Sequence, residues 1–207
     1  MTQQAFQQCI DQQADVLAQI KQTAHQLHEH VNQTYDHDHP YGFHLDMVVD
    51  AVYHFGHEVC ASAADVLPLF FGAYFHDSIE DARQTYNDVT RTARRFMDAS
   101  QAHLAAEIVY ALTNDKGRTR EERAGERYYR GIHETPYAPF VKLADRLANI
   151  TYSFTHTNEA NRHMQDVYRR ELPHFLQALQ TDADDIRFTL PQGMIRQLQT
   201  IVSGQQN

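Results

Sequence analysis

Val66-Leu-Pro-Leu-Phe-Phe-Gly-Ala-Tyr-Phe-His-Asp-Ser-Ile-Glu-Asp81 is the stretch of sequence that decides the fold. Its first ten residues are almost wholly apolar and lead directly to His76 and Asp77, which predicts a buried helix that carries polar side chains. His76 precedes Glu80 by four residues, and Asp77 precedes Asp81 by four. Side chains at this spacing are neighbours on a helix, so we expect all four on adjoining stripes of one helix. Because unpaired buried charges are costly, this pattern favours a metal centre over a solvated acidic helix.

Two further segments supply partners for these side chains. His44 lies near the start of an apolar-periodic run, and Asp145 interrupts the apolar face of a predicted helix over residues 140–150. Together, His44, His76, Asp77 and Asp145 would provide two imidazoles and two carboxylates. This donor set suits Mn²⁺, Fe²⁺ or Zn²⁺ better than Mg²⁺ or Ca²⁺. We expect Mn²⁺, with Fe²⁺ and Zn²⁺ as alternatives, and positions left open for water and a phosphoryl oxygen.

The order of these residues resembles the HD superfamily of metal-dependent phosphohydrolases. His76-Asp-Ser-Ile-Glu-Asp81 resembles the His-Asp-x-x-Glu-Asp signature of (p)ppGpp hydrolase domains, which occur in bifunctional alarmone synthetase-hydrolases and as single-domain small alarmone hydrolases. Lys142-Leu-Ala-Asp-Arg-Leu-Ala-Asn149 resembles their second signature, Lys-Leu-Ala-Asp-(Arg/Lys)-x-x-Asn. The resemblance implies a compact all-α HD-domain bundle with a metal site in its core cleft. It also implies a hydrolase that removes the 3′-pyrophosphate from (p)ppGpp in the stringent response.

The resemblance assigns roles to residues around the metal. Glu80 and Asp81 would orient and deprotonate the attacking water or deliver a proton to the leaving group, and we assign these tasks to the pair jointly. Asn149 would face the same cavity and hold the ribose or the base. Tyr41 is a candidate for stacking on the base or for binding phosphate.

A basic stretch offers a clamp for the anionic substrate. It holds six cations against three glutamates: Lys116, Arg118, Arg120, Arg123, Arg127 and Arg130 against Glu121, Glu122 and Glu126. Arginine forks match phosphate oxygens, and we expect Lys116, Arg120 and Arg123 to bind the substrate. Arg120 is preferred because the resemblance points to a basic residue near it. A solvated helix with internal ion pairs is the alternative.

One departure from the family pattern concerns the substrate. Family members usually carry basic residues several positions before the first metal-binding histidine, where they help to hold the nucleotide, but residues 32–40 include no Lys or Arg. Two alternatives to the alarmone hydrolase therefore stay open. One is an HD-type nucleotidase or phosphatase for another phosphorylated nucleotide, such as NADPH. The other is a catalytically silent metal-containing regulatory module.

Length and composition are those of one helical domain. A chain of 207 residues can bury a sizeable core, and we expect a single domain over residues 1–207, with the motifs at about 40–150 and flanking helices at both ends. Few Gly and Pro and recurring helical periodicity predict an all-α protein. Further helices are expected at residues 4–31, 85–96, 100–112, 119–129, 139–149, 159–179 and 191–202.

The charge and the apolar runs restrict the partners. A net charge of −9 argues against a nucleic-acid polymer, so the expected partner is a small phosphorylated nucleotide. No apolar run approaches the length of a membrane span, and the polar first eight residues do not resemble a signal peptide. We therefore expect a cytoplasmic protein without a membrane partner. The sequence leaves the oligomeric state open.

Overall fold

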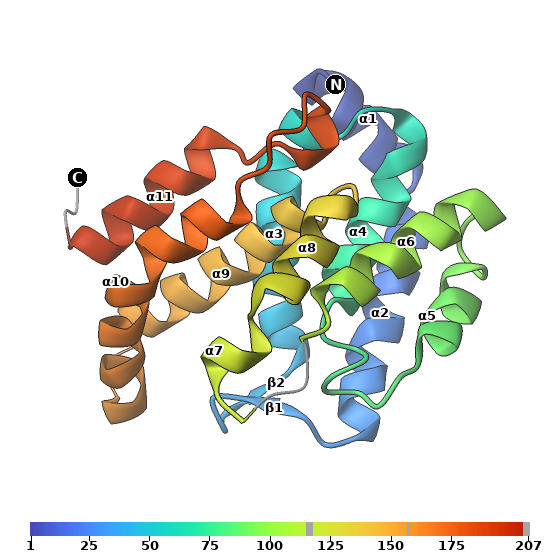
Figure 1. The fold of residues 1–207 in the computed structure, drawn as a ribbon. Coiled ribbons are helices and arrows are strands. Elements are labelled where there is room, and N and C mark those ends of the chain that lie inside the picture. The colour runs from blue at the N-terminus through green and yellow to red at the C-terminus, as the bar shows by residue number, and fades with distance from the viewer. Residues whose placement is uncertain (115–117, 157, 205–207) are drawn as a thin grey trace.

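The structure, a computed structural model, describes residues 1–114, 118–156 and 158–204. Helices account for most of these residues (Figure 1), which confirms the expected all-α class. The helices are α1 (Gln3–Gln12), α2 (Ala14–His30), α3 (Gly42–Val59), α4 (Val66–Phe75), α5 (Tyr86–Ala93), α6 (Ala99–Leu112), α7 (Arg120–Arg123), α8 (Glu126–Glu134), α9 (Ala138–Thr155), α10 (Glu159–Leu179) and α11 (Gln192–Ser203). Two 3₁₀ turns, η1 (Ala63–Asp65) and η2 (Ile186–Phe188), and a short antiparallel hairpin, β1 (Thr34–Tyr35) and β2 (His39–Pro40), complete the described elements.

Two of the helices expected from the sequence are divided in the structure. The single helix expected at residues 4–31 is broken at Gln13, whose backbone leaves the helical conformation (φ −111°, ψ 11°). The apolar pattern could not locate this break because the same period continues on both sides of it. The helix expected at residues 119–129 is divided into α7 and α8 by Gly125, which has extended backbone angles and precedes the first residue of α8. Glycine has a low helix propensity, which explains the division.

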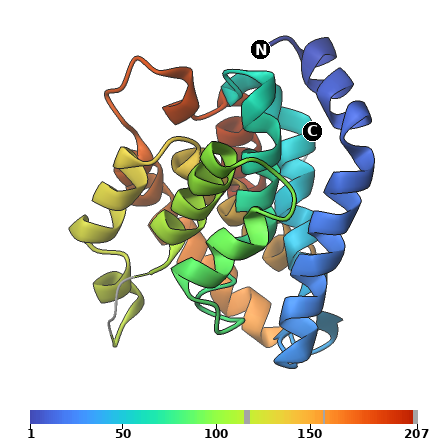
Figure 2. The same ribbon diagram turned by 90° about the vertical axis from the view of Figure 1, so that its right-hand side faces the viewer.

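Helices α3, α4 and α9 form the centre of the molecule. Helix α3 packs against α4 and α9, α4 also packs against α6, and α9 packs against α10 and α11. Figure 2 shows α1 and α2 running along the outside of α3 and α4. Every residue of α4 is buried, as its apolar sequence predicts. Within the described ranges, no helix combines the length and apolarity needed to cross a membrane.

A glycine allows α4 and α6 to pack closely. A Cβ atom placed on Gly72 of α4 would lie 2.6 Å from Cγ2 and 3.1 Å from Cβ of Ile108 on α6. Ile108 is fully buried, so neither helix can yield without disturbing the core. The position of α4, and therefore of the residues that follow it, depends on this close approach.

We expect Gly72→Ala to lower the free energy of unfolding by about 1–3 kcal/mol, because an extra methyl group overpacks a buried helix contact. Gly131→Ala in α8 is a matched control, since a Cβ at Gly131 meets no atom within 4 Å among the described residues. That change should be neutral or should stabilise by up to about 1 kcal/mol, through helix propensity alone. Urea denaturation followed by circular dichroism measures both. Equal effects would contradict the close-packing argument.

Candidate metal centre

Three core helices bring the predicted metal-binding residues together. His44 lies in the first turn of α3, His76 and Asp77 follow the last residue of α4, and Asp145 lies within α9. Both histidines are buried, with 1% and 2% of their surface exposed. The side chains of Asp77 and Asp145 keep 22% and 13% of their surface, so the open side of the centre is the carboxylate side.

The distances between these side chains show that the four residues form one cluster. Nε2 of His44 lies 3.3 Å from Nε2 of His76, 3.6 Å from Oδ2 of Asp77 and 3.5 Å from Oδ1 of Asp145. Nε2 of His76 lies 2.9 Å from Oδ2 of Asp77 and 3.8 Å from Oδ1 of Asp145. Ligand atoms of His44, His76 and Asp145 all lie within 4.8 Å of one another, so this buried group could hold a metal ion.

The orientation of His76 fits a metal ligand. Its Nδ1 donates a hydrogen bond to the carbonyl oxygen of Ala73 at 2.8 Å. In the neutral ring, Nε2 then carries a lone pair that is directed at the cluster. Nε2 of His44 and two carboxylates face that lone pair. These acceptor atoms repel one another unless a proton or a cation lies among them. Two imidazoles and two carboxylates therefore match the donor set of a borderline divalent ion.

Charges within the cluster shift the pKa values of its members in opposite directions. Burial alone lowers the pKa of His44, but hydrogen bonds and charges from Asp145 and Asp77 outweigh it and raise that pKa to about 9. Burial acts to raise the pKa of Asp145, but the charge of Lys142 and the bond to His44 hold it well below its usual range. In the metal-free protein the carboxylates are thus ionised and bind protonated imidazole.

The helix does not continue through the His-Asp pair, and here the sequence-based expectation was wrong. Helix α4 ends at Phe75, and the residues from His76 to Asp81 form consecutive turns. The Ala73 carbonyl, which would accept the Asp77 N–H in a continuing helix, accepts Nδ1 of His76 instead. Side-chain bonds of this kind compete with helix bonds. The Asp81 N–H still donates to the Asp77 carbonyl at 2.8 Å, so the two aspartates stay one turn apart.

The two carboxylates predicted to handle protons lie in different environments. Glu80 is exposed, and its carboxylate accepts hydrogen bonds from the backbone N–H and from Nδ2 of Asn114. Asp81 is half-buried, and burial together with the negative charge of Asp77 raises its pKa. A raised pKa makes a carboxylate a better proton acceptor and lets the carboxyl group keep its proton at a higher pH.

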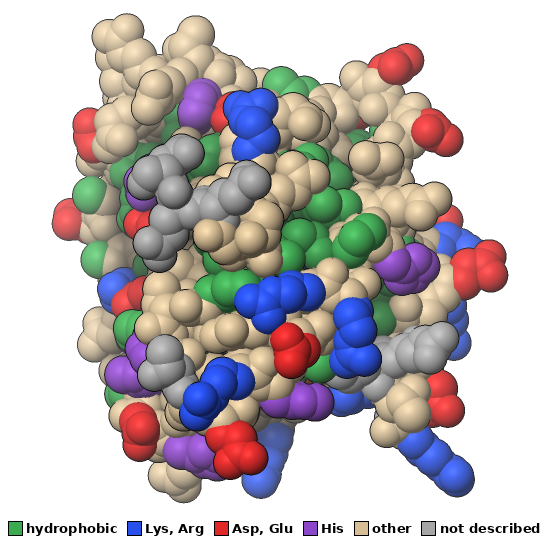
Figure 3. Space-filling model, turned by 90° about the vertical axis from the view of Figure 1, so that its left-hand side faces the viewer, with side chains coloured by type: hydrophobic (Ala, Val, Ile, Leu, Met, Phe, Trp, Pro, Cys, Tyr) green, Lys and Arg blue, Asp and Glu red, His purple; other side chains and the backbone are tan. Residues whose placement is uncertain are grey.

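A cavity of about 680 Å³ opens beside Asp145. It is lined by residues of α7, α8, α9 and α10 and by residues that follow α6 and α7: Asn114, Arg123, Ala124, Tyr128, Tyr129, Lys142, Asp145, Arg146, Asn149, Tyr168, Arg170, Glu171, His174 and Phe175. Figure 3 views the molecule from the left-hand side of Figure 1, where α10 lies, and shows basic side chains interspersed with acidic ones and histidines. The cavity joins the candidate metal centre to a set of cationic and aromatic side chains.

The predicted substrate-binding residues are placed differently with respect to this cavity. Asn149 and Arg123 line it. Tyr41 is buried, and its hydroxyl donates to Oδ2 of Asp77 at 2.5 Å, so it contacts the candidate metal centre. Lys116 lies outside the described residues. Arg120 is the first residue of α7, and the structure describes only its backbone.

Three cations of the cavity were not predicted as site residues: Lys142, Arg146 and Arg170. A signal for two of them was present in the sequence. Residues 142, 145, 146 and 149 are polar and recur at i, i+3, i+4 and i+7, which places them on one face of the otherwise apolar α9. Arg170 has no comparable signal, because α10 is polar over much of its surface and only its packing against α9 selects the face that meets the cavity.

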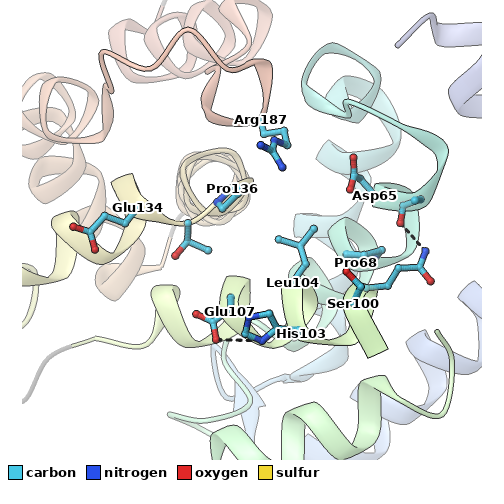
Figure 4. A pocket seen from close by; sticks show the side chains of 12 residues that line it. Asp65, Pro68, Ser100, His103, Leu104, Glu107, Glu134, Pro136 and Arg187 are labelled. Atoms are coloured by element: carbon cyan, nitrogen blue, oxygen red, sulfur yellow. Dashed lines mark hydrogen bonds and ion pairs between the residues drawn. The ribbon is translucent and has the colours of Figure 1, made fainter. Parts of the chain in front are cut away.

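A second cavity, of about 390 Å³, lies between η1, α6, η2 and the segment that joins α8 to α9 (Figure 4). Two of its titratable side chains are engaged with neighbours. Glu107 accepts a hydrogen bond from Tyr86, and Arg187 forms an ion pair with Asp185 at 2.6 Å. None of the four residues of the candidate metal centre lines this cavity.

Comparison with known proteins adds no assignment to this geometry. No protein-family model matches the chain, and no curated protein matches it at a significant level.

We expect Asp77→Ala to abolish tight binding of a divalent ion and to leave a folded helical protein, because it removes a carboxylate that lies against both histidines. Asp46→Ala is the matched control. Asp46 also lies on α3, but it pairs with Lys21 and His25 away from the centre. Metal content by plasma mass spectrometry, read beside circular dichroism, decides the outcome. Full occupancy in the Asp77 variant would remove this residue from the ligand set.

Metal affinity should rise with pH from 6 to 8. Nε2 of His44 must lose its proton before it can bind a metal, and the pKa of about 9 in the metal-free protein moves this competition above the usual histidine range near 6.5. Displacing one proton makes affinity rise by up to about tenfold per pH unit below that pKa. Competition of the protein with a chelator for Zn²⁺ at each pH measures the slope. A flat profile would contradict ligation by His44.

Proposed function

We propose that this chain is a metal-dependent phosphohydrolase that acts on a phosphorylated nucleotide, with removal of the 3′-pyrophosphate from (p)ppGpp as its first candidate reaction. One observation carries the proposal: two buried imidazoles and two carboxylates converge beside a large cavity lined by cationic and aromatic side chains. Such a centre supports phosphoryl transfer, where positioning and charge neutralisation provide most of the catalysis.

The four residues of the centre would hold one divalent ion, with Mn²⁺ as the first candidate. When bound, such an ion supplies a water of lowered pKa and polarises a phosphoryl oxygen. Hydrogen-bond donors from neighbouring side chains hold both carboxylates in place. The Tyr41 hydroxyl holds Oδ2 of Asp77, while Nζ of Lys142 lies 3.0 Å from Oδ2 of Asp145. Nδ2 of Asn149 donates to Oδ1 of Asp145 at 2.6 Å. These bonds keep carboxylate oxygens directed at the histidines.

The cavity beside the centre has the charge and the size for a nucleotide. Its volume of about 680 Å³ lies in the range of small-molecule sites. Arg123, Lys142, Arg146 and Arg170 outnumber its two carboxylates, Asp145 and Glu171. Arginine binds phosphate oxygens in bidentate fashion, so a polyphosphate would find complementary charge here.

Aromatic rings in the cavity favour a ligand that also has a planar part. The Arg146 guanidinium lies over the rings of Phe175, at 4.2 Å, and Tyr168, at 5.2 Å, and it pairs with Glu171 at 3.1 Å. Rings and guanidinium planes stack readily on nucleobases. We therefore place the base of the nucleotide towards α10 and its phosphates towards Asp145.

Asp81 and Glu80 would divide the proton handling with help from their neighbours. Asp81, with its raised pKa, is suited to carry a proton to the leaving oxygen or to take one from water. Glu80 is held by both nitrogen donors of Asn114, which also lines the cavity. This link would fix Glu80 at the edge of the substrate site.

A second candidate is hydrolysis of a different phosphorylated nucleotide, such as NADPH. The segment before His44 favours it, because residues 32–40 include no Lys or Arg and instead form the β1–β2 hairpin. The cations of the site come from α9, α10 and Arg123 instead. A different arrangement of cations would select a different arrangement of phosphates.

Incubation of the protein and Mn²⁺ with ppGpp and with NADPH, followed by separation of products, tests the proposal. We expect GDP and pyrophosphate from ppGpp. In the Glu80→Gln variant, metal content should stay at the wild-type value while turnover falls by about 10²- to 10⁴-fold, the usual effect of losing one acid–base group. Glu107→Gln is the matched control, because Glu107 lies on α6 in the second cavity.

Each outcome of this experiment has a separate meaning. Orthophosphate from NADPH, without cleavage of ppGpp, would replace the first candidate by the second. Bound metal without turnover of any nucleotide would leave a regulatory module. A Glu80→Gln protein that loses its metal would make Glu80 a ligand, and one with full turnover would exclude it from the reaction.

A further inference from the structure

The β1–β2 hairpin places an aromatic side chain directly on the candidate metal centre. The ring of Tyr35 lies parallel to the imidazole of His44, with 5.0 Å between ring centroids and 12° between planes. The Tyr35 hydroxyl donates to Oδ1 of Asn149 at 2.9 Å. Tyr35 comes from a hairpin outside the core helices, yet it contacts α3 through its ring and α9 through its hydroxyl.

The hydroxyl of Tyr35 acts on Asp145 through an amide. Asn149 accepts the Tyr35 hydroxyl with its oxygen and donates from Nδ2 to Oδ1 of Asp145 at 2.6 Å. Both ends of the amide are therefore occupied, and its orientation is fixed. The oxygen of Asp145 that receives this bond is the one that lies 3.5 Å from Nε2 of His44. Tyr35 thus restrains one metal-binding residue by stacking and a second through Asn149.

Asp36 fastens the hairpin to the rest of the molecule. Its Oδ2 accepts three hydrogen bonds, from the Tyr152 hydroxyl at 2.8 Å and from Nδ2 of Asn158 and of Asn161, each at 3.1 Å. These donors belong to the end of α9 and the start of α10. Asp36 has a positive φ of 49°, a conformation that is unfavourable for most side chains. Three hydrogen bonds to one carboxylate oxygen offset that cost and hold the turn next to Tyr35.

We propose that Tyr35 is a positioning residue of the metal centre. The three hydrogen bonds that Asp36 accepts, which we call the Asp36 clasp, hold Tyr35 in place. The hairpin then serves as a strap that ties His44 of α3 to Asp145 of α9, so that both ligands keep their spacing whether or not substrate is bound. This inference rests on the proposed metal centre, but it is independent of which nucleotide is the substrate. It also gives residues 32–40, which lack basic side chains, a role at the metal.

The test uses Co²⁺ alone as the probe, in the full chain and without substrate. Affinity is measured by competition with a chelator, and the visible absorption of bound Co²⁺ reports the ligand geometry. Tyr35→Phe keeps the stacking and removes the hydroxyl, and we expect about tenfold weaker binding with a shifted spectrum, the lower end of the effect of losing an outer partner of a metal ligand. Tyr35→Leu, which also removes the ring, should weaken binding by about 100-fold.

Two further variants make the comparison specific. Asp36→Ala removes the clasp and should shift the spectrum in the same direction as Tyr35→Phe. Tyr53→Phe is the matched control, because Tyr53 is an exposed residue of α3 that packs on Phe70 away from the centre. It should bind Co²⁺ like the wild type.

The outcomes distinguish the strap from the centre itself. Binding and spectra of the Tyr35 variants that equal those of Tyr53→Phe would overturn the positioning role and leave the metal centre intact. A wild-type protein that binds no Co²⁺ would overturn the centre and the strap together. Tyr35→Phe loses a single oxygen atom, so it decides the matter even where Tyr35→Leu fails to fold.

Discussion

The rest of the structure depends on holding four mutually repelling acceptor groups within one small space. Nε2 of His44 and of His76 lie 3.3 Å apart, and carboxylate oxygens of Asp77 and Asp145 lie within 4 Å of them. Such an arrangement is costly without a cation or protons among the acceptors. The protein maintains it by supplying each carboxylate with an outer donor, so that the cluster is a restrained set of candidate ligands with one open side.

The core helices meet this requirement through their packing. Helix α4 is apolar on every face and buried along its whole length, so its position is fixed by contacts on all sides and by the close approach of Gly72 to Ile108. The helix ends where the His76 side chain takes the Ala73 carbonyl, which turns the chain and directs His76 and Asp77 at α3 and α9. The precision of the centre is therefore a property of helix packing, and its chemistry resides in the first residues after the helix.

The two flanks of the centre have different chemical characters. One flank carries two pairs of stacked aromatic rings. His28 lies nearly parallel to Tyr41, with 4.5 Å between the ring centroids, and Tyr35 lies nearly parallel to His44. On the other flank, the cavity carries Lys142, Arg146 and Arg170. Both nitrogen atoms of His28 are buried and have no hydrogen-bond partner among the described residues, and burial lowers its pKa to about 4. The His28 end of the aromatic flank is therefore uncharged at neutral pH, whereas the opposite flank is cationic.

The sequence by itself determined the helical class and the four residues that meet at the centre, because long apolar periods and isolated polar residues inside them are local signals. His76 and Asp77 could be chosen from the sequence since they follow a buried run, and Asp145 since it interrupts one. Only the tertiary structure decided where α4 ends, that Tyr35 stacks on His44, that Tyr41 bonds to Asp77, and that Arg170 meets the cavity. These features depend on contacts between residues far apart in the chain. Tyr35 and Asn149, for example, are separated by 114 positions. A periodic pattern within one segment cannot predict such a contact. The packing of α3, α9 and α10 brings the two residues together.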